Sequence, residues 1–286
     1  MSNRPAGADD LKLPVKRTDG ETLEDRLTAN AYHNILPARY LRKDPEGNPR
    51  ESQEELFPRV AKNVALAEAV FEADARDAEI TVTPDQLKPE HPRRDELAAE
   101  VFGKGVTADD DAETTLSAHN VNKFAYDTVV PELPEAVREP VVEKREEFES
   151  MMDSLSFMPN SPTLMNAGDE LQQLSACFVD SPEDDIDDIH QTAKEAAQVF
   201  QSGGGMGYAF WRLRPYGDPV GSTGGIASGP ITFMRTYDQL CETIAQGGAR
   251  RGAQMGVMRV SHPDVIQFIH AKNKDVSLAH TLRLND

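Results

Sequence analysis

The sequence predicts an α/β protein in which a helical N-terminal region precedes a body of alternating strands and helices. Two observations predict this fold class. Residues 151–286 contain 14 of the 19 glycines, and short apolar segments there alternate with amphipathic helical segments, as in a parallel sheet covered by helices. Residues 1–150 contain 33 acidic and 20 basic residues, and their apolar residues recur at helical spacing.

The first half is expected to contain a tail, helices and an acidic insertion. Residues 1–25 are polar and lack periodicity, which predicts a mobile tail before a helical region over 26–150. A helix is expected to begin after Ser52, because Ser52 and Glu55 have capping-box spacing. Residues 73–115 are acidic with scattered prolines, which predicts a surface insertion or linker, and a second helix is expected over about 139–156. The apolar face of the first helix is predicted to comprise Leu56, Val60, Val64, Ala67 and Phe71.

The second half, residues 151–286, is expected to supply the α/β body. Helices are expected over 184–202, from 228 to about 248 and over 263–272, with strands over 206–213 and 255–260. This order of elements predicts parallel strands.

The charge and the apolar content of the chain indicate which partners and which location to expect. The net charge of −19 disfavours binding to nucleic acid or to an anionic membrane, because phosphates would be repelled. Such a charge is typical of proteins adapted to high salt, and an ordinary acidic protein is the alternative. No apolar run reaches eighteen residues and the N-terminus has no signal-peptide pattern, so we expect a cytoplasmic protein.

Two glycine clusters are candidate ligand sites. Residues 202–207 (SGGGMG) follow a predicted helix and precede a predicted strand, which is the reverse of a dinucleotide fingerprint, and no P-loop lysine follows. Residues 245–253 place Arg250 and Arg251 in a glycine loop, where guanidinium groups can bind phosphate or remain in solvent. Arg212 and Arg214 alternate at the end of a predicted strand, so both could face one ligand.

The two cysteines differ in their expected roles. Cys241 lies beside the apolar stripe of a predicted helix, so we expect it in the core. Cys177 lies in a short apolar segment of strand type, and its surroundings do not distinguish a small core residue from a reactive thiol. The histidines and cysteines show no metal-ligand spacing, so we expect no metal site.

Taken together, these segments resemble the ribonucleotide reductase large subunit. The resemblance covers about 150–275 and is weaker around 28–72. The motifs are most similar to those of the adenosylcobalamin-dependent class. Residues 15–20 resemble the first strand and turn of an ATP-cone domain, but the helices of a working cone do not follow them. The matching motifs are residues 157–168 (FMPNSPTLMNAG), 174–179 (LSACFV), 202–207 (SGGGMG), 212–215 (RLRP), 217–220 (GDPV), 222–230 (STGGIASGP), 246–253 (QGGARRGA) and 262–264 (HPD).

The resemblance implies a fold, a reaction and a cofactor. The family fold is a ten-stranded α/β barrel behind a helical N-terminal region, of which residues 151–286 would form the first part. The family replaces the 2′-hydroxyl of a ribonucleotide with hydrogen, using a thiyl radical and a pair of reducing cysteines. The implied cofactor is adenosylcobalamin. The implied partners are a ribonucleotide substrate, a deoxynucleoside triphosphate or ATP effector, a thioredoxin-like reductant and a second copy of the subunit.

The resemblance also implies site residues. Cys177 takes the place of the first reducing cysteine, and the substrate would contact Ser161, Ala176, Cys177, Gly205 and Arg250. Asp184 takes the place of the acid that binds the sugar of the effector. The other effector contacts would be Arg212, Arg214, Gln246 and Arg251, the last two on the loop that relays effector identity to the substrate.

One departure limits these expectations. The radical cysteine of the family and the second reducing cysteine would lie beyond Asp286, so we expect a fragment that does not turn over alone. Two alternatives remain open: a metal-cofactor large subunit that needs a radical-generating partner, and a non-catalytic domain that senses nucleotides.

Overall fold

The computed structural model describes residues 20–44, 46–221, 224–244 and 252–272, which form two compact units divided between Leu174 and Ser175. The division lies beyond residue 150, where the composition changes. Residues 151–174 belong to the first unit because Leu164 and Ala167 pack with Leu56 and Phe57 in one buried cluster. This segment includes the short helix α7 (Ser161–Asn166).

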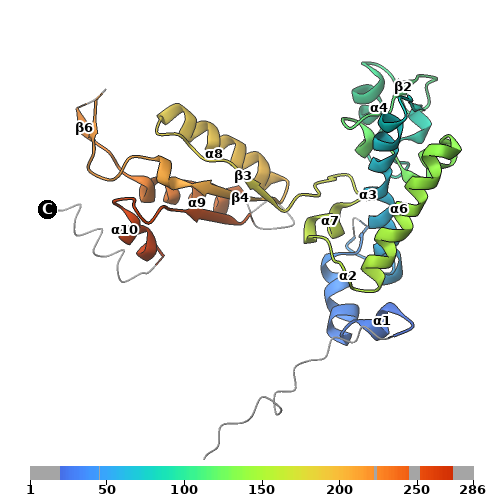
Figure 1. Ribbon diagram of the computed structural model, residues 1–286, viewed down its shortest axis with the longest axis horizontal. Helices are drawn as coiled ribbons and strands as arrows, with labels where there is room; N and C mark the ends of the chain where they lie inside the picture. Colours follow the sequence, from blue (N-terminus) through green and yellow to red (C-terminus); the bar gives the residue numbers. More distant parts are fainter. Residues whose placement is uncertain (1–19, 45, 222–223, 245–251, 273–286) are drawn as a thin grey trace, which may run out of the picture. The chain divides into compact units, whose positions relative to one another are not determined.

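Two long helices, α3 (Gln53–Ala75) and α6 (Glu135–Asp153), pack along each other in the first unit (Figure 1). The predicted capping box is present, with the Ser52 amide donating to Oε2 of Glu55 over 2.7 Å. The predicted inward position of Phe71 is wrong, because its side chain is 60% exposed. At 3.6 residues per turn, Phe71 lies about 60° around the helix from Leu56, and Val70 occupies the buried position instead.

The segment expected to be a surface insertion contributes to the core of the first unit. Val82, Leu87 and Leu97 are at most 5% exposed and pack in the same cluster as Leu116 and Phe124. Periodicity does not reveal this, because the apolar residues are spread over very short elements. These elements are β1 (Thr81–Val82), η3 (Pro84–Gln86), α4 (Arg94–Phe102), β2 (Thr114–Thr115) and η4 (Val121–Lys123). The remaining elements of the unit are α1 (Leu23–Arg26), the π-helix η2 (Ala31–Ile35), α2 (Leu36–Arg39), α5 (Tyr126–Val129) and η5 (Val130–Glu132).

The second unit is built on a three-stranded parallel sheet with the order β3-β4-β7, as the alternation of elements predicts. The strands are β3 (Cys177–Val179), β4 (Gly205–Ala209) and β7 (Gln254–Val257). Helices α8 (Ile186–Gln201) and α9 (Pro230–Ile244) pack against each other and share a buried cluster with Met206 and Tyr208 of β4. The unit therefore has the alternation of parallel strands and helices found in a segment of an α/β barrel, although its sheet is not closed.

Several boundaries in the second unit differ from those predicted. The strand expected over 206–213 ends at Ala209, where a 3-10 turn, η6 (Phe210–Arg212), redirects the chain. The strand expected over 255–260 is β7, and the helix expected over 263–272 is α10 (Val265–His270). A short antiparallel pair, β5 (Pro219–Val220) and β6 (Gly225–Ile226), lies between η6 and α9.

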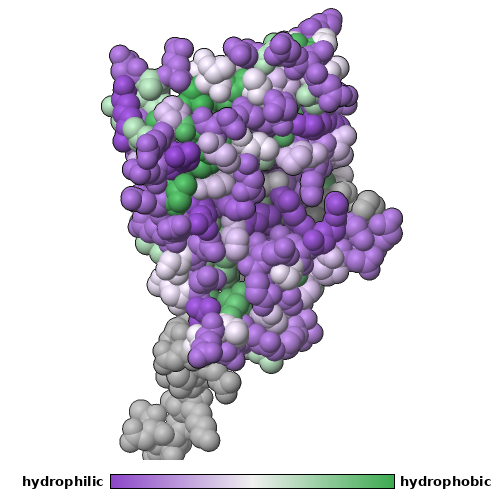
Figure 2. Space-filling model, turned by 90° about the vertical axis from the view of Figure 1, so that its right-hand side faces the viewer, coloured by the Kyte–Doolittle hydropathy of each residue, from purple (hydrophilic) through white to green (hydrophobic). Residues whose placement is uncertain are grey.

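The surface reflects the acidic composition. The face shown in Figure 2 presents mainly hydrophilic side chains, with apolar ones in small groups. Within the residues described above, every helix is too short or too polar to cross a membrane.

Lys88 is a buried cation of the first unit, with 8% of its surface exposed. Its Nζ donates to the backbone oxygen of Asp169 over 3.2 Å and to Oε1 of Gln172 over 2.8 Å. Burial, with repulsion from Arg42, lowers the pKa of Lys88 from 10.5 to about 8. Below pH 8 the folded and unfolded chains both carry the proton, whereas between pH 8 and 10.5 the unfolded chain binds more protons.

We therefore expect the free energy of unfolding to rise with pH in this window, by roughly 2 kcal/mol from pH 8 to 10. Urea titrations at a series of pH values measure it. Lys88→Met should be more stable at pH 7 and should lack the rise. A profile that is the same in Lys88→Met and the unmodified chain would show that Lys88 is not the cause.

Candidate functional site

Cys177 lies on the face of the parallel sheet that none of the described helices covers. It begins β3 and pairs in register with Gly205 of β4, and its side chain is exposed. Residues paired across parallel strands share a face, so Val179 and Met255, paired with Gly207 from either side, belong to the same face. Val179 is 83% and Met255 67% exposed, whereas Met206 and Tyr208, which point the other way, are buried beneath the helices. The thiol is therefore accessible on an apolar face.

Gly205 lies at a tight point between the strands beside Cys177. Its amide donates to the oxygen of Ala176 over 2.8 Å. A Cβ at this position would lie 3.0 Å from the oxygen of Ala253 and 3.4 Å from that of Ala176. The position paired with Cys177 thus carries no side chain, and the polar atoms nearest to it are backbone oxygens of Ala253 and Ala176.

Cys241 is a core residue, as the sequence predicts. It is 7% exposed and packs in the cluster beneath the sheet. Burial raises the pKa of its thiol, with a further contribution from Asp238. A buried thiol with a raised pKa is a poor nucleophile and a poor redox group.

The acidic residues before α8 and the arginines after β4 are brought together. Nε of Arg214 donates to Oδ2 of Asp184 over 2.6 Å, and the Arg214 amide donates to Oδ1 over 3.1 Å. Arg212 forms an ion pair with Glu183. Asp185 instead caps α8, accepting hydrogen bonds from the amides of Asp187 and Asp188 over 2.9 and 3.2 Å.

Trp211, the only tryptophan of the chain, lies next to this cluster. The guanidinium carbon of Arg259 lies 3.4 Å from the centre of its ring, and that of Arg212 lies 5.6 Å away. Guanidinium groups over an indole face are held by cation–π attraction. Three of the arginines described in the second unit thus gather around Asp184 and Trp211.

Two further buried polar residues contact this region and were not expected from the sequence. His262 and Asp264 are 8% and 5% exposed, and both bond to the backbone between Leu213 and Tyr216. The only signal in the sequence was the motif HPD at 262–264, to which the resemblance attached no role.

Ser161 lies in the first unit, at the start of α7. Its Oγ lies 3.1 Å from Oη of Tyr40, and the preceding Asn160 caps the helix by accepting from the Thr163 amide over 3.0 Å. Because Ser161 and Cys177 belong to different units, the predicted contact of both with one substrate stays a prediction.

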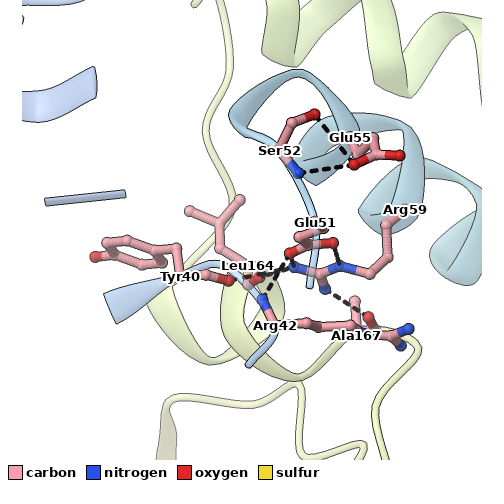
Figure 3. A network of polar contacts seen from close by, with 8 residues as sticks. All are labelled: Tyr40, Arg42, Glu51, Ser52, Glu55, Arg59, Leu164 and Ala167. Atoms are coloured by element: carbon pink, nitrogen blue, oxygen red, sulfur yellow. Dashed lines mark hydrogen bonds and ion pairs between the residues drawn. The ribbon is translucent and has the colours of Figure 1, made fainter. Parts of the chain in front are cut away.

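Arg59 holds the other end of α7 (Figure 3). It donates to both carboxylate oxygens of Glu51, over 2.7 and 2.8 Å. It also donates to the carbonyl oxygens of Leu164 and Ala167, over 3.2 and 2.7 Å. The ion pair of Arg59 and Glu51, whose side chains are 10% and 8% exposed, thereby fixes the C-terminal end of α7.

The profile of the ribonucleotide reductase all-alpha domain matches residues 25–172, and that of the reductase barrel domain matches residues 175–285. The chain belongs to the ribonucleotide reductase large-subunit family. The boundary between the two matched domains agrees with the division of the structure at Leu174 and Ser175.

Individual reductases show the same similarity. A vitamin B12-dependent ribonucleoside-diphosphate reductase of Thermoplasma acidophilum is 38% identical over 264 residues, which is 87% of this chain and 31% of the relative. A Mycobacterium tuberculosis protein of the same name is 36% identical over 243 residues, 85% of this chain and 26% of its own length. The ribonucleoside-diphosphate reductase large chain of Neurospora crassa is 35% identical over 130 residues, 45% of this chain and 14% of its own. The chain thus spans about a third or less of these reductases.

Three predicted site residues of this reductase chain, Gln246, Arg250 and Arg251, lie outside the described residues. Ser161 lies in the first unit, and the remaining six form two groups in the second unit: Ala176, Cys177 and Gly205 at the start of the sheet strands, and Arg212 and Arg214 beside Asp184.

Neither of two cavities in the first unit suits adenosylcobalamin. Two cavities of about 460 and 160 Å³ are found in the first unit. The larger is a hollow walled by charged side chains, among them Arg26, Arg145 and Glu149, whereas a corrin needs extended apolar contact. The smaller is below the size of a drug-sized ligand. We assign no cobalamin contact to the described residues.

Proposed function

We propose that this chain supplies the first reducing cysteine, part of the substrate wall and the effector site of a vitamin B12-dependent ribonucleotide reductase. The observation that carries the proposal is the exposed Cys177 on the apolar face of a parallel sheet, next to the side-chain-free surface at Gly205.

The open face of the sheet supports a barrel. In an α/β barrel the helices cover the outside of the strands, and the inner face is filled by side chains from the other strands. Here α8 and α9 cover one face, and Val179, Met255 and Val257 of the other are 83%, 67% and 47% exposed. Cys177 would thus point into the barrel, where water is excluded and the nucleotide reacts.

The proposed role of Cys177 is to give up electrons to the sugar. The C2′–O bond breaks and the oxygen leaves as water, and a C2′–H bond forms. Two thiols supply the two electrons and two hydrogens and join in a disulfide, so Cys177 needs a second cysteine from another segment of the reductase. A single thiol would be left as a radical. A thioredoxin-like dithiol would reduce the disulfide after each turnover.

The proposed effector site is the cluster of Asp184 and Arg214. A carboxylate suits the hydroxyl of a sugar and a guanidinium suits phosphate oxygens, which together describe a nucleotide. Their 2.6 Å ion pair fixes both side chains before the ligand arrives. Arg259 adds positive charge nearby, in a chain whose net charge of −19 would otherwise repel a triphosphate.

We expect dATP to change the fluorescence of Trp211, because the guanidinium groups of Arg212 and Arg259 lie near the ring of this only tryptophan. Arg214→Ala and Asp184→Ala should each weaken dATP binding by about tenfold or more, since each removes a charge-assisted hydrogen bond. Arg235→Ala, which removes an exposed arginine of α9, is the matched control and should leave the dissociation constant unchanged. Weakening by Arg235→Ala equal to that by Arg214→Ala would indicate only a change in net charge, and unchanged binding by Asp184→Ala would exclude the carboxylate from the site.

The class of reductase is tested by the cofactor requirement. A complete reductase that carries this sequence should reduce ribonucleotides with adenosylcobalamin and no second subunit. Activity only with an added radical-generating subunit would assign it to the metal-cofactor class. Effector binding without reduction under either condition would favour the nucleotide-sensing alternative.

A further inference from the structure

Two buried polar side chains on the turn after β7 bind the backbone on either side of Arg214. Nε2 of His262 lies 3.0 Å from the oxygen of Leu213. The amide of Tyr216 donates to Oδ2 of Asp264 over 2.8 Å. His262 and Asp264 are 8% and 5% exposed, so both contacts are shielded from water.

The direction of each hydrogen bond follows from the geometry. The amide of Asp264 donates to Nδ1 of His262 over 3.1 Å, so Nδ1 is unprotonated. The proton of the neutral ring is therefore on Nε2, which donates to the carbonyl of Leu213. The Asp264 carboxylate accepts from the Tyr216 amide, so each of the two side chains holds one backbone group of the segment.

The segment between these contacts has little conformational freedom. Pro215 fixes its own φ and restricts Arg214, the residue before it. The backbone of Tyr216 packs on Gly229, where a Cβ would lie 2.8 Å from the Tyr216 nitrogen and φ is +74°. The amide of Arg214 donates to Asp184, so three neighbouring backbone groups of the segment are anchored.

We propose that His262 and Asp264 are positioning residues of the effector site, which hold the backbone of Leu213 to Tyr216 so that Arg214 meets the phosphates of a nucleoside triphosphate. The inference rests on the proposed effector role of Arg214. Neither residue touches the ligand. Because the anchored carbonyl and amide flank Arg214 and Pro215, releasing either one lets the guanidinium leave Asp184, and the ligand must then order the segment when it binds.

His262→Ala and Asp264→Ala should each weaken dATP binding by about tenfold, measured by Trp211 fluorescence. His262→Gln keeps a donor for the Leu213 carbonyl and Asp264→Asn keeps an acceptor for the Tyr216 amide, so both should bind within about twofold of the unmodified chain. The matched control is Tyr237→Phe. It removes another buried hydrogen bond of the same unit, from Oη of Tyr237 to the oxygen of Ile189 over 2.7 Å, and should leave dATP binding unchanged.

A second measurement needs no variant. Saturating dATP should slow hydrogen exchange at the Tyr216 amide, because the ligand stabilises the anchored form of the segment. Unchanged exchange at Tyr216 while Trp211 reports binding would overturn the inference, even if the alanine variants fail to fold.

The outcomes separate this inference from the proposed function. If the unmodified chain does not bind dATP, both the proposed effector site and the proposed positioning role of His262 and Asp264 are wrong. If Arg214→Ala loses binding while His262→Ala and Asp264→Ala bind as the unmodified chain does, only the positioning role is wrong. If Tyr237→Phe weakened dATP binding as much as the alanine variants do, the weaker binding would result from lower stability of the unit, and the positioning role would again be wrong.

Discussion

Replacing Cys177 by serine in a complete reductase that carries this sequence is expected to lower deoxyribonucleotide formation by about 1,000-fold or more. A hydroxyl has nearly the shape of a thiol, so the exposed position at the start of β3 should tolerate it. It cannot close a disulfide, however, and the reducing pair is then incomplete. Turnover is followed as deoxyribonucleotide formed with a dithiol reductant present.

Cys241→Ala is the matched control for this experiment. It removes the other cysteine of the chain, which is buried in the cluster beneath the sheet. We expect a loss of about 1 kcal/mol in the free energy of unfolding and nearly full turnover per folded molecule. If Cys177→Ser kept full activity, or if both variants lost it equally, Cys177 would have no specific redox role.

The second large effect is expected in the first unit, from Glu51→Ala. The Glu51 carboxylate accepts two hydrogen bonds from Arg59, at 2.7 and 2.8 Å, and the two side chains are 8% and 10% exposed. Removing the carboxylate leaves a guanidinium charge in a largely buried site, which costs about 3–5 kcal/mol when a buried pair is broken. Arg59 also anchors the carbonyls at the end of α7, so the segment that carries Ser161 should loosen.

Urea unfolding measures this loss, with Glu147→Ala as the control. Glu147 forms an exposed pair with Lys144 on α6, with side chains 45% and 47% exposed. Exposed pairs contribute about 0–1 kcal/mol, so this variant should change stability little. Similar effects of Glu51→Ala and Glu147→Ala would show that the buried pair does not hold the first unit together.

Local signals in the sequence predicted the elements that depend on local physics. The capping residues Ser52 and Glu55 located the start of α3, and the alternation of apolar segments and helices indicated the parallel order of β3, β4 and β7. The position of Cys241 beside an apolar stripe placed it in the core. Periodicity failed for residues 78–124, because strands of two residues and turns of three are too short to show a period.

The contacts within the candidate site could not be predicted from the sequence. Asp184 and Arg214 are 30 residues apart, and no local pattern indicates that they form an ion pair. Arg212 was expected on a strand, but a 3-10 turn after Ala209 sends it to Glu183 instead. His262 and Asp264 form hydrogen bonds with backbone groups some 50 residues away, and contacts over that distance in the sequence are seen only in the folded chain.

A single turnover without external reductant tests the redox role of Cys177 most directly. A complete reductase that carries this sequence would be mixed with one equivalent of ribonucleotide and adenosylcobalamin, quenched with an alkylating reagent and mapped by mass spectrometry. Our account predicts one disulfide per deoxyribonucleotide formed, with Cys177 as one partner. A reduced, alkylated Cys177 alongside a full equivalent of deoxyribonucleotide would contradict it.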